Sequence, residues 1–229
     1  MNIRIVGLFV GRAKVIVPDD SNRQSDQPWE SGIFKDPVPG SVWLSYGGLQ
    51  GDGQADRKNH GGPEKAVCVY PAAHYEYWRR QPGLAQITFG GFGENITLEG
   101  ATEAQLCIGD RFQFDEVIVE ISQPRQPCWK LSRRWHVEDL KEQAERTGLT
   151  GFYFRVIKHG WLRPNNTGML LDRLWPQWNL AECNAIMHQR LDDHAAALRL
   201  SECQQLSTTW RDKLFERARS SADIMTSRQ

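Results

Sequence analysis

The chain has 229 residues, and its 28 lysines and arginines are balanced by 28 aspartates and glutamates. This length suits one large domain, or a main domain with a small appendage. The balanced charge provides no overall field to attract nucleic acid or a membrane surface, and without a run of about 18 apolar residues we expect no transmembrane helix. The five cysteines form no CxxC pair, which argues against a disulfide framework or a paired-cysteine zinc site and favours a reducing, cytoplasmic location.

Up to about residue 160 the sequence alternates short β-forming runs with turns rich in glycine and proline. We predict strands at Ile3–Val10, Val42–Tyr46, Ala66–Tyr70, Arg111–Phe114, Val117–Ser122 and Phe152–Lys158. Helices are expected at Ala72–Arg80 and Val137–Arg146, the second ending at Gly148. Because the strands do not alternate regularly with helices, the pattern favours a mainly β, barrel-like domain with some α structure over a doubly wound sheet.

The composition changes after Trp161. Residues 163–178 contain two prolines and an Asn-Asn pair, which are typical of a connecting segment. Helical stretches follow at Asn179–Gln189, Asp192–Ser201 and Thr208–Arg219, the last with Ser207 as its N-cap. We therefore predict a main domain at 1–162, a linker at 163–178 and a small three-helix C-terminal appendage at 179–219.

The first candidate site is the segment Gly51–Lys65, GDGQADRKNHGGPEK. Its glycines and its proline prevent a regular helix or strand throughout. Four basic side chains occupy this short loop: Arg57, Lys58, His60 and Lys65. A glycine-rich backbone lets amide groups approach a ligand, and cationic side chains complete a cradle for an anion. The alternative is a solvated turn, and the segment is no P-loop because that consensus is absent.

The second candidate is Gln123–Lys130, QPRQPCWK, which directly follows a predicted strand. Pro124 and Pro127 stiffen the loop that presents Cys128 at the strand end. Basic side chains surround this cysteine in sequence: Arg125, Lys130, Arg133 and Arg134. Such surroundings favour the thiolate, which is the form that binds soft metals or attacks electrophiles. The alternative for Cys128 is the structural role that we expect for the other four cysteines.

Taken in order along the chain, several motifs together resemble the MOSC domain. They are residues 31–38 (SGIFKDPV), 51–52 (GD), 60–67 (HGGPEKAV), 93–95 (GEN), 108–110 (IGD), 124–128 (PRQPC) and 151–157 (GFYFRVI). Single motifs of this kind are weak, but HGGPEKA followed by GEN and PRxPC in one sequence is specific. The helical tail is similar to the small α-helical extension of YiiM-type MOSC proteins, so the resemblance spans nearly the whole chain.

This resemblance implies a MOSC-type barrel that binds a molybdenum cofactor of the molybdopterin type, with Cys128 as the protein ligand to the metal. It implies cofactor contacts from Lys35, Arg57, Lys58, His60, Gly61, Gly62, Asn95 and Arg125. YiiM-type proteins are associated with resistance to N-hydroxylated base analogues such as 6-hydroxylaminopurine. The implied enzyme is therefore an oxidoreductase, independent of pyridoxal phosphate, that reduces the N-hydroxyl group of a small molecule to an amine.

The chemistry of the residues agrees with that assignment. One protein thiolate can complete a molybdenum ligand set whose other sulfurs come from the cofactor. The sequence carries no Rossmann fingerprint and no cysteine cluster for an iron–sulfur centre, so we expect electrons from a separate reductase. With Cys128, His60 completes the expected catalytic pair as a proton donor, because imidazole titrates near neutral pH.

Three other interpretations stay open. Cys128 could carry a persulfide in a sulfur carrier or transferase, which would hold no molybdenum tightly. The tail could bind nucleic acid through Arg211, Lys213, Arg217 and Arg219, but nearby acidic residues favour a solvated helix face, so we expect no nucleic-acid partner. The tail could instead form a homodimer interface or dock the reductase. Its apolar positions must pack against something, and they are Leu180, Ile186, Leu191, Leu198, Leu206, Leu214 and Phe215.

Overall fold

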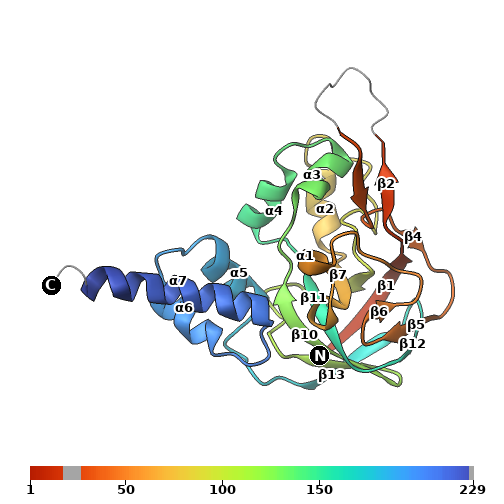
Figure 1. Ribbon diagram of the computed structural model, residues 1–229. Helices are drawn as coiled ribbons and strands as arrows, with labels where there is room; N and C mark the ends of the chain where they lie inside the picture. Colours follow the sequence, from red (N-terminus) through yellow and green to blue (C-terminus); the bar gives the residue numbers. More distant parts are fainter. Residues whose placement is uncertain (18–26, 227–229) are drawn as a thin grey trace.

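The computed structural model describes residues 1–17 and 27–226, with the side chains of Arg57 and of residues 221–226 outside that description (Figure 1). In chain order its elements are β1 (Asn2–Val10), β2 (Lys14–Ile16), β3 (Trp29–Ser31), β4 (Asp36–Pro37), β5 (Val42–Ser45), β6 (Gly48–Leu49), α1 (Arg57–His60), the 3-10 turn η1 (Pro63–Lys65), β7 (Val67–Pro71), α2 (His74–Arg79), β8 (Ile96–Glu99), β9 (Arg111–Phe114), β10 (Val117–Pro124), α3 (Trp129–Trp135), α4 (Leu140–Thr147), β11 (Phe152–Lys158), β12 (Gly160–Leu162), β13 (Thr167–Asp172), α5 (Leu180–His188), α6 (His194–Ser201) and α7 (Thr208–Thr226).

The central sheet closes into a barrel. Its strands follow one another in the order β13, β9, β10, β11, β7, β8 and β1, and β1 pairs back with β13, placing Ile3 opposite Gly168. The β7–β8 pair is parallel, and the other pairs in this ring are antiparallel. The prediction of a mainly β, barrel-like domain is confirmed.

Alternation along the strands fills the barrel interior. In the hairpin of β9 and β10, Phe112 and Phe114 are buried opposite Val119 and Val117. Asp115 turns the chain between the two strands with a φ of 50°, a conformation that aspartate tolerates better than most residues. The burial of one face fixes the register, because a shift by one residue would expose both phenylalanines.

The segment predicted as a linker contributes a barrel strand instead. Residues 163–166 form a tight turn, in which Asn165 has a φ of 68° and its backbone N–H donates to Ile5 O at 2.8 Å. β13 follows this turn and lies between β1 and β9. Gly168 is required at the crossing, because a Cβ there would lie 2.5 Å from the ring of Phe114. The barrel therefore extends ten residues beyond the predicted boundary at 162, to Asp172.

Helices α2, α3 and α4 gather at one end of the barrel with the β2–β3 hairpin (Figure 1). They enclose a second apolar cluster that is separate from the barrel core and includes Trp29, Tyr75, Trp78, Phe92 and Leu131. The sequence did not indicate α3. Its end at the left-handed residue His136 also delays the start of α4, which begins three residues after the predicted Val137.

The C-terminal appendage, α5 to α7, projects from the side of the barrel (Figure 1). Leu180, Ile186, Leu206 and Leu214 join the barrel core in one continuous apolar cluster. The other three predicted apolar positions stay exposed: Leu191 at 53%, Leu198 at 41% and Phe215 at 45%. The appendage therefore packs on its own barrel, and a homodimer stays a prediction.

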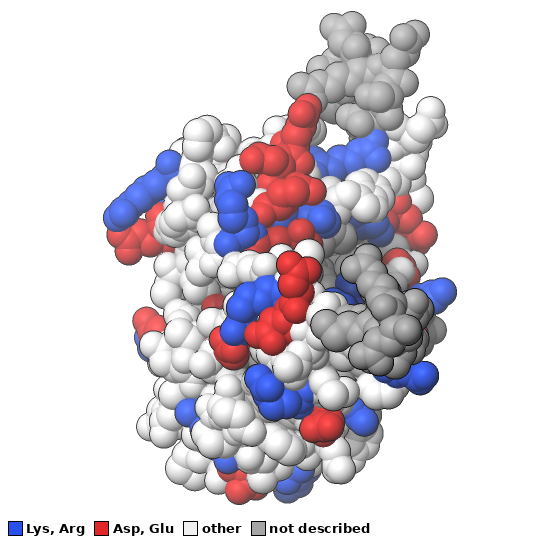
Figure 2. Space-filling model, turned by 90° about the vertical axis from the view of Figure 1, so that its left-hand side faces the viewer, with Lys and Arg blue, Asp and Glu red and all other residues white. Residues whose placement is uncertain are grey.

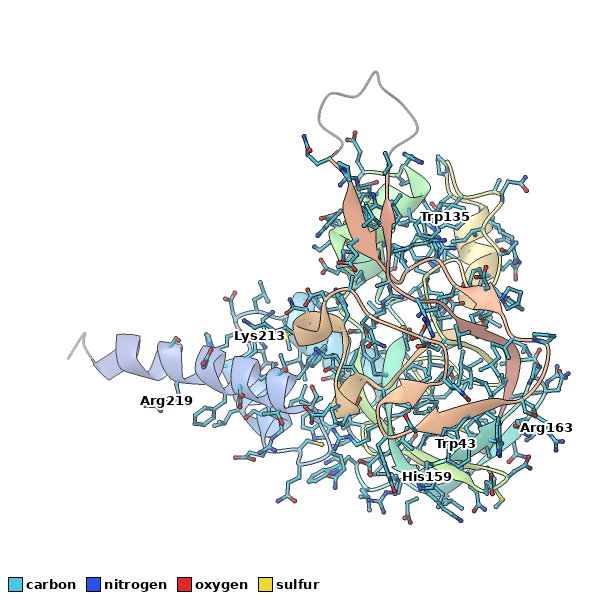
Figure 3. The ribbon with its side chains drawn as sticks, turned by 45° about the vertical axis from the view of Figure 1, so that its right-hand side comes forward. Trp43, Trp135, His159, Arg163, Lys213 and Arg219 are labelled. Atoms are coloured by element: carbon cyan, nitrogen blue, oxygen red, sulfur yellow. The ribbon has the colours of Figure 1, made fainter. Side chains whose placement is uncertain are left out.

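The charged residues of α7 form no single basic face. Lys213 and Arg219 lie on different sides of the helix (Figure 3). Arg211 and Arg217 donate to backbone carbonyls of the appendage, Arg217 to Ile186 O at 2.8 Å. On the molecular face toward the appendage, basic and acidic side chains are interspersed (Figure 2). Within the described residues, no helix has the length and apolar character needed to cross a membrane.

Candidate functional site

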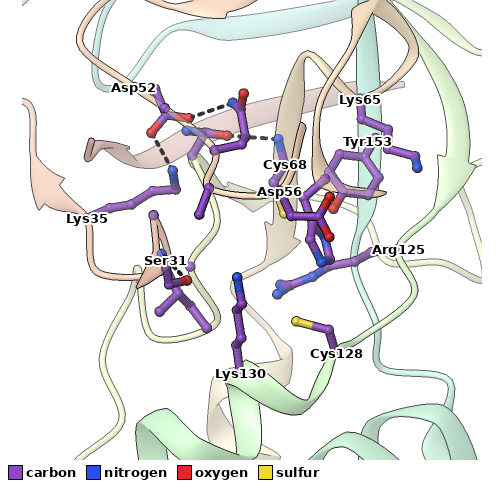
Figure 4. A pocket seen from close by; sticks show the side chains of 18 residues that line it. Ser31, Lys35, Asp52, Asp56, Lys65, Cys68, Arg125, Cys128, Lys130 and Tyr153 are labelled. Atoms are coloured by element: carbon purple, nitrogen blue, oxygen red, sulfur yellow. Dashed lines mark hydrogen bonds and ion pairs between the residues drawn. The ribbon is translucent and has the colours of Figure 1, made fainter. Parts of the chain in front are cut away.

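A pocket opens at the end of the barrel where β10 leads into α3 (Figure 4). It encloses about 600 Å³ of free space, a volume that includes the solvent at its open mouth. Its walls come from segments far apart in the chain, namely residues 31–35, 52–56, 60–68, 93–95, 125–130 and Tyr153. The barrel thus brings both candidate segments from the sequence into one cavity.

One wall is held by a buried ion pair between Lys35 and Asp52. Their side chains are only 5% and 3% exposed. The same carboxylate oxygen of Asp52 also accepts the backbone N–H of Gly11 at 2.9 Å. Lys35 therefore lines the pocket, but its charge is already neutralised by Asp52, a residue of the first candidate segment that was not among the expected cofactor contacts.

The loop of the first candidate site folds back on itself. Asp56 caps α1 by accepting the backbone N–H of Asn59 at 3.0 Å and its side-chain amide at 2.8 Å, and these hydrogen bonds lower the pKa of Asp56. Lys65 donates from Nζ to Asn59 O at 2.8 Å, and burial lowers the pKa of its ammonium group. Both side chains line the pocket, so the glycine-rich segment is an organised wall.

His60 lies at the end of α1 and faces the pocket. Burial, followed by the charge of Arg125, lowers the pKa of its imidazole to about 4. His60 is therefore neutral at physiological pH in the pocket as the structure has it. Lys58 and Gly62 are exposed and, like Gly61, lie outside the pocket wall. Lys58 differs from His60 because residues two positions apart on a helical turn point in different directions. The side chain of Arg57 lies outside the described part of the chain.

Arg125 is a buried cation in the wall of the pocket. It is only 7% exposed, and its Nη1 has no hydrogen-bond partner among the described residues. Burial opposes the charge, yet the pKa of the guanidinium is raised, because Cys68 and Tyr153 nearby are negatively charged at the high pH where it titrates. Burial also raises the pKa of Cys68 and of Tyr153, so neither supplies a negative charge at neutral pH. The pocket wall therefore contains a buried cation with an unused hydrogen-bond donor, an arrangement that suits an anionic ligand.

Cys128 lies beside this guanidinium (Figure 4). It is the N-terminal flanking residue of α3 and is partly exposed, whereas the other four cysteines are buried. The prediction that Cys128 differs from the rest agrees with this exposure. Cys68, which we expected to be structural, also lines the pocket from β7.

Asn95 lines the pocket, but its amide is used to join strands. Its Oδ1 accepts the backbone N–H of Cys68 at 3.0 Å, and its Nδ2 donates to Phe9 O at 3.3 Å. The preceding Glu94 accepts the backbone N–H groups of Gly90 and Phe92, which stabilises the FGGFGEN bend. The hydrogen bonds of Glu94 and Asn95 therefore hold the backbone of this bend and of the strands beside it.

Several lining residues were not among the expected cofactor contacts. Asp52, Lys65, Lys130 and Tyr153 reach the pocket from a loop, a turn, a helix and a strand. Asp52 and Lys65 fall inside the first candidate segment, so their motif pointed to them. Tyr153 could not be found this way, because alternation within β11 predicts only that it is buried.

A MOSC-domain family model matches residues 56–167. The protein YiiM of Escherichia coli strain K12 is 37% identical over 79% of this chain and 81% of its own length. The uncharacterized protein YflK of Bacillus subtilis strain 168 is 41% identical over 82% of this chain and 85% of its own length. A protein named "Reductase" from Gibberella moniliformis is 34% identical over 86% of this chain, which covers 35% of that longer protein.

The fold agrees with these relatives. The crystal structure of YiiM from Geobacillus stearothermophilus superposes with a TM-score of 0.78 and 33% identity, over 94% of this chain and 99% of that one. The match therefore includes the appendage as well as the barrel. The chain belongs to the MOSC-domain family, and within it to the proteins of the YiiM type.

Proposed function

We propose that this protein binds a molybdenum cofactor in the Arg125–Cys128 pocket and reduces small N-hydroxylated compounds to amines. The observation that carries the proposal is the desolvated guanidinium of Arg125, whose Nη1 has no partner among the described residues, beside a partly exposed thiol. Membership of the MOSC family and the name of the Gibberella relative support a redox role.

The residues of the pocket fit such a cofactor by their chemistry. A pterin phosphate is an anion, and Arg125, Lys65 and Lys130 provide cationic donors around one cavity. Cys128 provides a soft sulfur donor at the same place. We propose that these residues hold the cofactor, with Cys128 as the metal ligand and Arg125 as the counter-charge.

When bound, the cofactor would supply the two-electron chemistry that side chains cannot perform. The overall reaction, R–NHOH + 2e⁻ + 2H⁺ → R–NH₂ + H₂O, breaks the N–O bond and needs two protons. The buried wall around Arg125 would exclude bulk water, and His60 would hold one of the protons. A bound anion would raise the pKa of His60 from its value of about 4, because its negative charge would stabilise the imidazolium and offset the charge of Arg125.

The reducing equivalents are proposed to come from a separate reductase. The Gibberella protein that matches this chain over about a third of its own length carries the name "Reductase". Its additional length is consistent with a MOSC-type unit joined to other domains in one polypeptide.

The test is to quantify molybdenum per subunit in protein purified from a host that makes the cofactor. Wild type should carry near-stoichiometric metal, Cys128→Ser should lose it, and Cys107→Ser, a cysteine remote from the pocket lining, should retain it. The loaded wild-type protein should then consume 6-hydroxylaminopurine when it is supplied with a chemical reductant.

The second candidate is a sulfur carrier, favoured by the partial exposure of Cys128 beside a buried cation. It predicts a transferable sulfane sulfur on wild-type Cys128 and no tightly bound molybdenum in any variant. That result would replace the reductase proposal. Equal metal in wild type and Cys128→Ser would keep the cofactor and remove Cys128 from its ligands.

A further inference from the structure

The HGGPEK loop is attached to the appendage through Glu64. Both carboxylate oxygens of Glu64 lie 3.1 Å from the backbone nitrogen of Thr208, the first residue of α7. Arg155 from β11 donates to the same carboxylate at 3.3 Å. A carboxylate at this position satisfies a free helix N–H and faces the positive end of the helix dipole.

The other wall of the pocket is attached to the same turn. Ser207 donates from its backbone to Ser122 O at 2.9 Å and from its hydroxyl to the side chain of Gln123 at 2.6 Å. Ser122 in turn donates to the backbone carbonyl of Glu64. The first turn of α7 therefore binds β10 and the HGGPEK loop at once, and Ser122 joins those two segments directly.

Each of these contacts lies next to a pocket residue in the chain. Lys65 follows Glu64 directly, and Arg125 lies two residues after Gln123. Because neighbouring residues share a backbone, the position of the α7 turn limits where these cations can lie. The two walls otherwise come from segments about 60 residues apart, 60–65 and 122–128.

We propose that Glu64 is a positioning residue and that the first turn of α7 is an internal brace, which sets the spacing between the HGGPEK loop and the β10 end. The appendage therefore acts on the pocket from within its own chain. The brace rests on these contacts alone, whereas the molybdenum cofactor as the ligand that it positions rests on the proposed function.

The test compares three full-length variants. Glu64→Ala removes the acceptor for Thr208 N–H, and Glu64→Gln retains one acceptor oxygen but loses the charge. The control is Arg217→Met, which removes two hydrogen bonds from α7 to Ile186 O and Met187 O and leaves the loop contacts intact. In the metal-free protein, hydrogen exchange of peptides covering residues 57–66 measures the protection of the loop backbone. In the loaded protein, the rate of molybdenum loss measures how well the pocket retains its ligand.

Glu64→Ala should speed exchange at residues 57–66 by about tenfold and release molybdenum about tenfold faster, with Glu64→Gln in between. Arg217→Met should change the exchange rate and the rate of molybdenum release by less than about twofold. This should hold even if its melting temperature falls as far as that of Glu64→Ala. Equal effects of Glu64→Ala and Arg217→Met would overturn the brace, as would unchanged exchange in Glu64→Ala. Wild type without molybdenum would reject the proposed function, while the exchange data would still decide the brace. If Glu64→Ala does not fold, Glu64→Gln gives the same comparison with a smaller effect.

Discussion

Lys35 and Asp52 form an ion pair inside the pocket wall, and both side chains are almost completely removed from solvent. Breaking such a pair leaves one buried charge without its partner. We expect Lys35→Met to lower the free energy of unfolding by about 3 kcal/mol. The double variant Lys35→Met/Asp52→Asn should recover part of that loss, which urea denaturation of both variants would measure. Additive losses would show that the pair contributes nothing beyond its separate parts.

Arg125 should respond in the opposite way, because its guanidinium forms no ion pair with any of the described residues. We expect Arg125→Met to leave the metal-free protein as stable as wild type, or more stable by about 1 kcal/mol. The same change should weaken cofactor retention by at least about tenfold, since a charge-assisted hydrogen bond is removed. Denaturation of the metal-free protein and molybdenum content after dialysis check the two halves. A large loss of stability would mean that Arg125 serves the fold.

His60 should make stability depend on pH. Its pKa is about 4 in the folded protein and about 6.5 when unfolded, so between these values the unfolded chain binds more protons. The free energy of unfolding should therefore fall as pH drops from about 6.5 to about 4, by about 3 kcal/mol at most. His60→Gln should remove this component, measured by urea denaturation at a series of pH values. Identical pH profiles for the two proteins would contradict the low pKa.

Gly32 marks a close approach of two pocket loops. A Cβ at this position would lie 2.2 Å from the carbonyl oxygen of Gly53, which is backbone and cannot swing away. We expect Gly32→Ala to lower the melting temperature by several degrees through a cost of about 1–3 kcal/mol. Gly40→Ala is the matched control, because nothing lies within 4 Å of its Cβ. Equal melting temperatures for the two variants would show that the loops move apart freely.

The barrel was predictable where a strand has a recognisable pattern in its own sequence. Phe112 and Phe114 alternate with polar residues, and Val117 and Val119 repeat the same two-residue spacing after Asp115-Glu116, so the pattern gives a hairpin with one buried face. β13 was missed because its turn contains Pro164 and two asparagines, the residues that also mark linkers. What makes it a strand is its pairing with β1, some 165 residues away, which no local pattern reports.

In the candidate site, too, local sequence identified some residues, while the orientation of others depends on the tertiary structure. Arg125 and Cys128 could be identified from sequence because a short proline-bounded loop among basic residues restricts what they can do. The sequence could not tell which side chains of the first loop face inward. His60 lines the pocket while Lys58 does not, and this depends on how one short helix turn, capped by Asp56, is oriented on the barrel.

The pairing of β1 with β13 also has a consequence for biosynthesis. β1 emerges from the ribosome long before its partner β13, because the two strands lie near opposite ends of the barrel sequence. The ring can therefore close only after residue 172 has been translated. Until then β1 and β9 each present an unpaired edge, which is a template for association with other chains. The pocket walls contributed by residues 31–68 and 125–130 acquire their final spacing only after that closure. Loading of any ligand therefore has to follow the synthesis of β13, and nascent chains arrested before residue 167 are expected to be substrates for chaperones.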